Sequence, residues 1–272
     1  MGTDVDELET GAARIRALGE VMPHEAPPGV AGIYDDIQAT LGVPFVNFIF
    51  RMLATRPAYL TAAWSAAAPA LRSSAFATAA DELRSGARAW ALLAVKDRAS
   101  WADVDGGESL RRFTATIHHV LPKLLLVATA LHEGRLRPAG AHRPAEPQRL
   151  PEALALPMVD PASADAPVAA VFERILRGHG HPGVASYYRA LGAYPAFLEA
   201  AWGEVEPLLE SASFARARHD AIEQANAFVH TLLDPHDEPP HAEELRPALA
   251  VFRHRLIPDL LLDVSVIQVW MS

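Results

Sequence analysis

The feature that most constrains this chain is that its sequence repeats. Shifting the sequence by 138 residues, the distance from Trp64 to Trp202, aligns residues 43–79 with residues 181–217. The identical pairs include Arg51/Arg189, Leu53/Leu191, Pro57/Pro195, Trp64/Trp202, Leu71/Leu209 and Phe76/Phe214. An alanine-rich composition cannot by itself align such different residue types. Each half of the chain is therefore predicted to be one copy of a duplicated unit.

The duplication and the helical period of the apolar residues predict an all-α fold. We expect two tandem homologous helical repeats, related by a pseudo-twofold axis. Pro57 and Pro195 stand where a helix should begin, since proline is tolerated in a first turn. The predicted divisions are a polar lead-in over residues 1–28, repeat 1 over 29–133, a proline-rich linker over 134–160 and repeat 2 over 161–272. The linker is expected to cross the surface in an extended form.

The composition of the chain argues against several classes of function. The chain has 272 residues and a net charge of −9, with no run of Lys or Arg. This argues against nucleic acid and against anionic membrane surfaces as partners. It has no cysteine, so disulfides and thiolate metal sites are excluded. The amino-terminal residues lack the apolar segment of a signal peptide. We expect a cytoplasmic protein.

Three segments carry a resemblance to a known family. They are YDDIQATLGVPFVNFIFRMLATRPAYLTAAW, HPGVASYYRAL and PKLLLVATAL, which begin at Tyr34, His181 and Pro122. They resemble the group I 2-haloacid dehalogenases of the DehI type, and the resemblance extends from about Tyr34 to Ile267. It implies an all-helical homodimer with a small-molecule pocket between the repeats. In that family a buried aspartate activates a water, which displaces halide from the α-carbon without a covalent intermediate.

The resemblance also implies site positions, and two of them differ here in chemistry. Tyr187 stands where the family has its aspartate, and Leu121 stands where it has an asparagine. Phe45 replaces a tryptophan of the pocket wall. The further pocket positions that the resemblance and the repeat imply are Phe48, Leu124, Ser186, Arg253, Ile257 and Leu260. A phenol with an ordinary pKa near 10 cannot act as the base at pH 7, so we expect little or no halide release from 2-chloropropionate.

Two histidines could supply the missing chemistry. His118 and His254 each lie four residues before a proline, Pro122 or Pro258, and so at nearly equivalent points of the two repeats. Each precedes pocket positions by one helical turn, so we expect their imidazoles on opposite walls of one cavity. They could then divide acid and base roles with Tyr187, share a metal ion or ligate a haem. The alternative is that both are core histidines bonded to neighbours.

Two other sets of residues leave alternatives open. Arg253 has no counterpart in repeat 1, so it is either a clamp for a substrate carboxylate or a surface arginine. His179 and His181 precede Pro182 with a spacing that fits either a metal site or a structural loop. Because Arg51 and Arg189 recur in both repeats, they are expected to form structural salt bridges.

The leading functional prediction is an enzyme of this fold with a site rebuilt around His118, His254 and Tyr187. Its substrate would be a small organic acid or a similar polar molecule. One alternative is a 2-haloacid hydrolase in which a histidine activates the water. The other is a non-catalytic small-molecule-binding protein, or one that binds a metal or haem.

Overall fold

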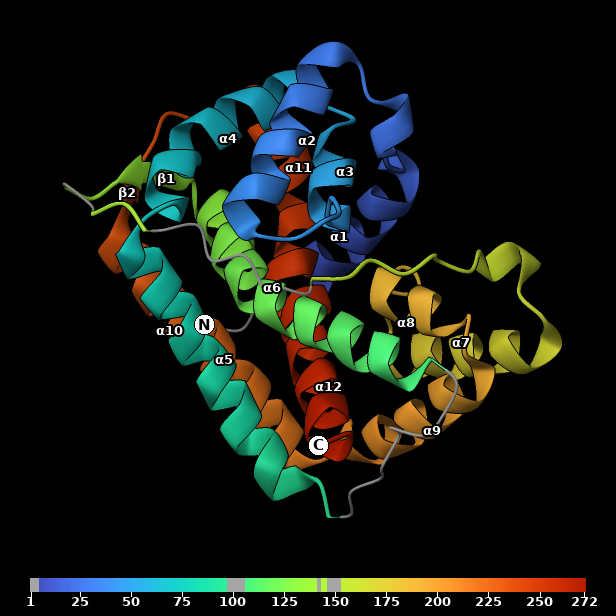
Figure 1. Ribbon diagram of the computed structural model, residues 1–272. Helices are drawn as coiled ribbons and strands as arrows, with labels where there is room; N and C mark the ends of the chain where they lie inside the picture. Colours follow the sequence, from blue (N-terminus) through green and yellow to red (C-terminus); the bar gives the residue numbers. More distant parts are fainter. Residues whose placement is uncertain (1–4, 97–105, 141–142, 146–152) are drawn as a thin grey trace.

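The computed structural model describes residues 5–96, 106–140, 143–145 and 153–272, and almost all of its regular structure is helical (Figure 1). The first half contains α1 (Val5–Leu18), α2 (Pro28–Leu41), α3 (Phe48–Leu53), α4 (Pro57–Leu71), α5 (Ser74–Ala94) and α6 (Gly107–Glu133). The second half contains α7 (Ala166–His179), α8 (Ser186–Leu191), α9 (Pro195–Val205), α10 (Ala212–Leu232), α11 (Ala242–Val251) and α12 (Ile257–Trp270). Short 3₁₀ turns lie at Pro23–Glu25, Pro161–Ser163 and Glu206–Leu208. The predicted all-α class is confirmed.

The helices begin where local chemistry favours a start. Proline occupies the first position of α2, α4 and α9, where its missing N–H costs no hydrogen bond. Ser73 and Ser211 cap α5 and α10, each accepting a hydrogen bond at 3.1 Å from the backbone N–H three residues later. The bounds of α2, α3 and α5 recur 138 residues later as those of α7, α8 and α10. This recurrence supports the predicted duplication, while the pseudo-twofold axis stays a prediction.

Helices α6 and α12 pack against each other at the centre of the molecule, and α5 and α10 lie side by side along one edge (Figure 1). By length and composition, α6 is the one described helix that could cross a membrane. However, 89% of its apolar window is buried inside the protein. That burial is typical of a core helix.

The two halves differ in their last helical element. Helix α6 runs without a break through Pro122. In the second half, a π-helical segment over Phe252–Leu256 separates α11 from α12. A π segment has a wider turn than an α-helix, so it changes the directions of the side chains around it.

The linker is more structured than predicted. Strand β1 (Arg135–Pro138) pairs antiparallel with β2 (Leu233–Pro235), which ties the start of the linker to the end of α10. Farther along, the Leu154 backbone N–H donates to the Thr116 hydroxyl at 3.0 Å. Leu156 and Met158 pack against the core. The linker therefore contributes to the interior rather than only crossing the surface; its residues 141–142 and 146–152 lie outside the described part.

Candidate functional site

A cavity of about 380 Å³ lies where α3, α6, α8 and α12 come together. Its walls are mostly apolar and come from both halves of the chain and from the linker. The apolar side chains include Phe45, Phe48, Phe113, Ile117, Val120, Leu121, Leu124, Met158, Phe252, Leu256, Ile257 and Leu260. This volume and lining suit a small organic ligand.

The polar groups of the cavity centre on Arg51, a buried residue of α3. Its Nε donates to the Glu20 carboxylate at 2.6 Å, and one terminal nitrogen donates to the Val46 carbonyl. The other terminal nitrogen donates to Ser186 Oγ at 3.3 Å. Arg189, on α8, places a terminal nitrogen 4.0 Å from Glu20. Arg51, Arg189, Ser186 and Glu20 all line the cavity, and below we call them the polar end.

Most of the predicted pocket positions face this cavity. Those that line it are Phe45, Phe48, Leu121, Leu124, Ser186, Tyr187, Ile257 and Leu260. On α6 the lining residues Phe113, Ile117, Val120 and Leu124 follow the spacing of one helical face.

Tyr187 lines the cavity, but its hydroxyl is already engaged. The residue is buried, and its hydroxyl shares a hydrogen bond of 3.1 Å with Thr114 on α6. Its ring stacks on Phe113 with centroids 5.7 Å apart. Burial raises the pKa of Tyr187 above its ordinary value of 10. The phenol therefore stays protonated near pH 7 and is no general base.

His118 does not line the cavity, contrary to the prediction. It is buried, and its Nε2 lies 3.0 Å from Ser265 Oγ on α12. The Ser265 hydroxyl donates to the Leu261 carbonyl at 2.6 Å, so it accepts from His118. Burial lowers the pKa of His118 to about 3, which keeps the ring neutral. The His118 ring therefore points toward Ser265 on α12, and the residue is not among those that line the cavity.

His254 and Arg253 are also turned away from the cavity. The His254 ring packs edge-on against His132, with centroids 5.7 Å apart. Burial lowers the pKa of His254 to about 4. Arg253 donates to His132 Nδ1 at 2.7 Å and also pairs with Glu133. Both residues belong to the π-helical segment, whose ends Phe252 and Leu256 face the cavity while its middle faces the opposite side.

His118 contacts Ser265 and His254 contacts His132, so the two imidazoles lie in separate side-chain packings. The core-histidine alternative describes both residues. Arg253 is a buried ion-pair partner rather than a carboxylate clamp or a surface arginine.

The charged residues of the cavity wall were not identified as site residues from the sequence. Arg51 and Arg189 were predicted as structural salt bridges, and both do pair with Glu20, but in the cavity wall. Glu20 lies outside every quoted segment, and Asn47 lies within the first of them but was not singled out as a site residue. Asn47 Oδ1 is buried and has no hydrogen-bond partner among the described residues. It could accept a hydrogen bond from a ligand hydroxyl or a bound water.

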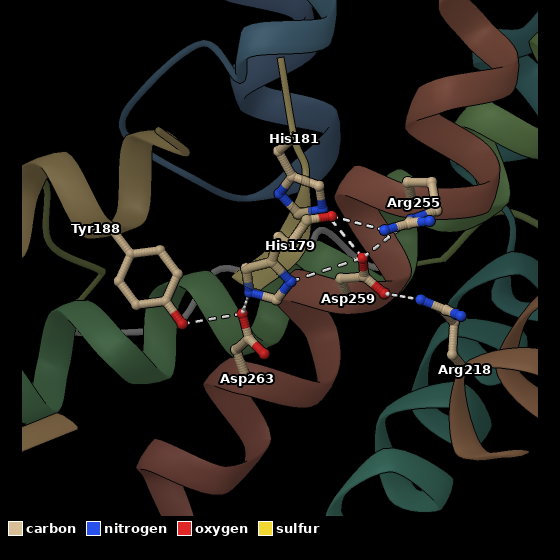
Figure 2. A network of polar contacts seen from close by, with 7 residues as sticks. All are labelled: His179, His181, Tyr188, Arg218, Arg255, Asp259 and Asp263. Atoms are coloured by element: carbon tan, nitrogen blue, oxygen red, sulfur yellow. Dashed lines mark hydrogen bonds and ion pairs between the residues drawn. The ribbon is translucent and has the colours of Figure 1, made fainter. Parts of the chain in front are cut away.

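A second polar cluster lies where the end of α7 meets α12 (Figure 2). His179 Nε2 lies 2.9 Å from an Asp263 oxygen, which also accepts from the Tyr188 hydroxyl at 2.9 Å. His181 Nε2 lies 3.0 Å from Asp259 Oδ2. Burial alone would lower the pKa of His179, but the two aspartates raise it to about 10. His179 is therefore a buried imidazolium at neutral pH.

His179, His181 and Asp259 have ligating atoms within 4.8 Å of one another, which is close enough to share a metal ion. The two imidazoles are stacked, with centroids 4.5 Å apart and only 8° between their planes. A zinc ion binds an imidazole nitrogen along its in-plane lone pair at about 2.0–2.1 Å, and the lone pairs of two stacked parallel rings do not meet at one point. Arg218 also occupies Asp259 Oδ1 at 3.2 Å. The cluster is a charge network, which agrees with the structural alternative for the two histidines.

Comparison with known proteins gives consistent matches. Residues 44–174 match the family model described as halocarboxylic acid dehydrogenase DehI. The configuration-inverting 2-haloacid dehalogenase of Alcaligenes xylosoxydans xylosoxydans is 34% identical over 213 residues, which cover 73% of this chain and 72% of the relative. The (R)-2-haloacid dehalogenase of Pseudomonas putida is 29% identical over 231 residues, covering 78% and 75%.

Solved structures show the same fold. The structure of a D-2-haloacid dehalogenase with L-LA superposes with a TM-score of 0.81, at 23% identity over 94% of this chain and 96% of that chain. A mutant of a D-2-haloacid dehalogenase with D-2-CPA gives a TM-score of 0.79 at 24% identity, with the same coverage. Together with the 34% identity to a curated relative, these matches show that the chain belongs to the DehI family of 2-haloacid dehalogenases.

Proposed function

We propose that the cavity binds a small monocarboxylic acid with an apolar substituent on C2, and that this chain dehalogenates 2-haloacids poorly or not at all. The observation that carries the proposal is the pairing of two arginines and a serine with apolar walls in one cavity of about 380 Å³. An acid of this kind has one anionic end and one apolar end, and the cavity has a matching group for each.

The carboxylate would lie at the polar end. Arg51 already donates to Glu20, Val46 and Ser186, so it holds Ser186 in place rather than offering a new bond. The Ser186 hydroxyl accepts from Arg51, which leaves its own hydrogen free to donate to a ligand. Arg189 donates from Nε to the Val159 carbonyl at 3.2 Å, one of its terminal nitrogens lies 4.0 Å from Glu20, and the residue lines the cavity. Ser186 and Arg189 are the expected donors.

The apolar substituent would pack against Phe45, Phe48, Leu121, Leu124 and Ile257. Each buried methylene contributes about 0.8 kcal/mol, or roughly a fourfold gain in affinity. Affinity is therefore expected to rise from propionate to butyrate to pentanoate until the cavity is filled.

Dehalogenation by direct attack of water requires a base beside the ligand. Among the described residues that line the cavity, Glu20 is the only acidic one and none is a histidine. The Glu20 carboxylate already accepts a hydrogen bond from Arg51 Nε at 2.6 Å, so this oxygen is engaged by the protein itself. The rebuilt site of two histidines is not supported, because neither histidine reaches the cavity.

A second candidate function is dehalogenation with Glu20 as the base. It is favoured by the position of Glu20 in the cavity wall and by the activity named for the relatives. In that reaction Glu20 would take a proton from water while the water oxygen forms a bond to C2. The carbon–halogen bond would break with inversion, and halide would leave with the electron pair. Chloride release that disappears in Glu20→Gln would identify this function.

Binding of butyrate by isothermal titration calorimetry tests the leading proposal. We expect saturable binding to the wild type, weakened about tenfold or more by Ser186→Ala and by Arg189→Gln. Arg177→Gln is the matched control, because Arg177 is exposed on α7 and does not line the cavity. Equal binding by all four proteins, or no binding by the wild type, would contradict the proposal.

A further inference from the structure

Arg16, in the last turn of α1, is a third arginine in the wall of the cavity. Arg16 is exposed, while the side chain of Arg189 is 23% exposed and that of Arg51 only 6%. Because all three line one cavity, their exposure orders them from the mouth of the cavity to its interior. Among the described lining residues, Arg16 is therefore the first positive charge that an entering molecule meets.

The charge of Arg16 is not neutralised by an ion pair within the described part of the chain. Glu20, the carboxylate of the cavity wall, accepts from Arg51 Nε at 2.6 Å and lies 4.0 Å from Arg189. Arg14, two residues earlier on α1, pairs with Glu244 at 3.8 Å and does not line the cavity. The Arg16 guanidinium is thus available to an anion that approaches the mouth.

The charge of the whole chain gives this position a consequence. The chain has 33 acidic and 24 basic residues, so its surface on average repels an anion. The described lining of the cavity has three arginines and one glutamate, which gives it the opposite sign. Charges gathered at a concave opening raise the rate at which a ligand of opposite charge arrives. Of the three arginines, the exposed Arg16 is best placed to act before contact.

We propose that Arg16 is a positioning residue that captures an entering carboxylate at the mouth of the cavity and passes it on to Ser186 and Arg189, an inference that rests on the proposed function. Its charge accelerates association. The final bonds of the carboxylate lie deeper in the cavity, so dissociation depends little on Arg16. A charge at the rim of a binding site typically changes the association rate and its salt dependence in this way.

The test compares butyrate with butyramide, which has nearly the same shape but no charge. Ligand NMR line shapes give the association and dissociation rate constants of each. In Arg16→Gln we expect butyrate to associate at least about threefold more slowly at 10 mM salt, where the Debye length is about 30 Å. At 1 M salt, where this length is about 3 Å, the difference should disappear. Dissociation of butyrate and both rates of butyramide should stay unchanged.

Two variants of the same helix are the controls. Arg14→Gln makes the same change in net charge outside the cavity lining and should associate with butyrate like the wild type. Arg16→Lys keeps the positive charge and should retain most of the association rate. Arg16→Met is a second neutral variant, and circular dichroism identifies which variant is folded and therefore used.

The possible failures are distinguishable. If the wild type does not bind butyrate, the proposed function is wrong. If it binds butyrate and neutralising Arg16 leaves the association rate unchanged, only the role of Arg16 is wrong. An equal slowing in Arg14→Gln, or an equal slowing of butyramide, would also contradict that role, because the effect would then not come from a charge at the mouth.

Discussion

At the scale of the residue, the protonation of the buried His179 is expected to stabilise the fold. Its pKa is raised to about 10 by Asp263 and Asp259, against an ordinary value of 6.5. A raised pKa stabilises the fold fully below pH 6.5, and this contribution is lost as the pH rises through 10. We expect the free energy of unfolding to fall by at least about 2 kcal/mol over this range.

Urea denaturation at pH 6.5, 8 and 10 measures this effect, with His179→Gln as the comparison. The variant has no proton to lose at this position, so its stability should fall less steeply with pH. Parallel pH dependence in the two proteins would show that His179 is neutral in the fold. Lys123, whose pKa burial lowers to about 8, titrates in both proteins and cancels in the comparison.

Tyr187 and Leu121 carry a second prediction at this scale. Placing a carboxylate and an amide in the cavity by Tyr187→Asp with Leu121→Asn would give a bound water a base that no arginine neutralises. We expect a measurable gain in chloride release from 2-chloropropionate. The loss of a buried aromatic ring should cost about 3–5 kcal/mol of stability. The single variant Leu121→Asn is the control, and equal chloride release by both variants would contradict this role for position 187.

At the scale of the element, the crossing of α1 and α11 depends on a glycine. A Cβ on Gly11 would lie 1.9 Å from the Pro247 carbonyl oxygen, so Gly11→Ala should push α1 away from α11 and cost more than about 2 kcal/mol. Gly32→Ala is the matched control, because nothing lies within 4 Å of its Cβ and alanine should stabilise α2 by about 0.5–1 kcal/mol. Thermal denaturation measures both. An unchanged melting temperature in Gly11→Ala would show that α1 and α11 do not pack this closely.

Sequence patterns predict elements better than they predict the direction of single side chains. The prolines at the starts of α4 and α9 mark helix starts correctly, since their effect is local. His118 and Leu121 were expected to share a helical face, but only Leu121 lines the cavity, together with Ile117 and Leu124, while His118 bonds to Ser265. The π-helical segment around His254 has no local signal, so the direction of that ring could not be predicted.

At the scale of the whole molecule, the cavity is built by elements far apart in the sequence. The resemblance to the family located half of the apolar side chains named for its wall, because several of them lie in quoted motifs such as residues 43–48. Glu20 comes from the lead-in and Met158 from the linker, and both reach the cavity only through tertiary packing. No periodicity of a single segment contains that information.

The central claim is that this cavity binds a 2-substituted monocarboxylate but lacks a competent base. One proton NMR experiment on 2-chloropropionate with the wild-type protein tests both parts. We predict saturation transfer from the protein to the ligand methyl group, which would pack against the apolar wall, and no lactate signal above the protein-free control. Absence of saturation transfer, or accumulation of lactate at an enzymatic rate, would contradict the account.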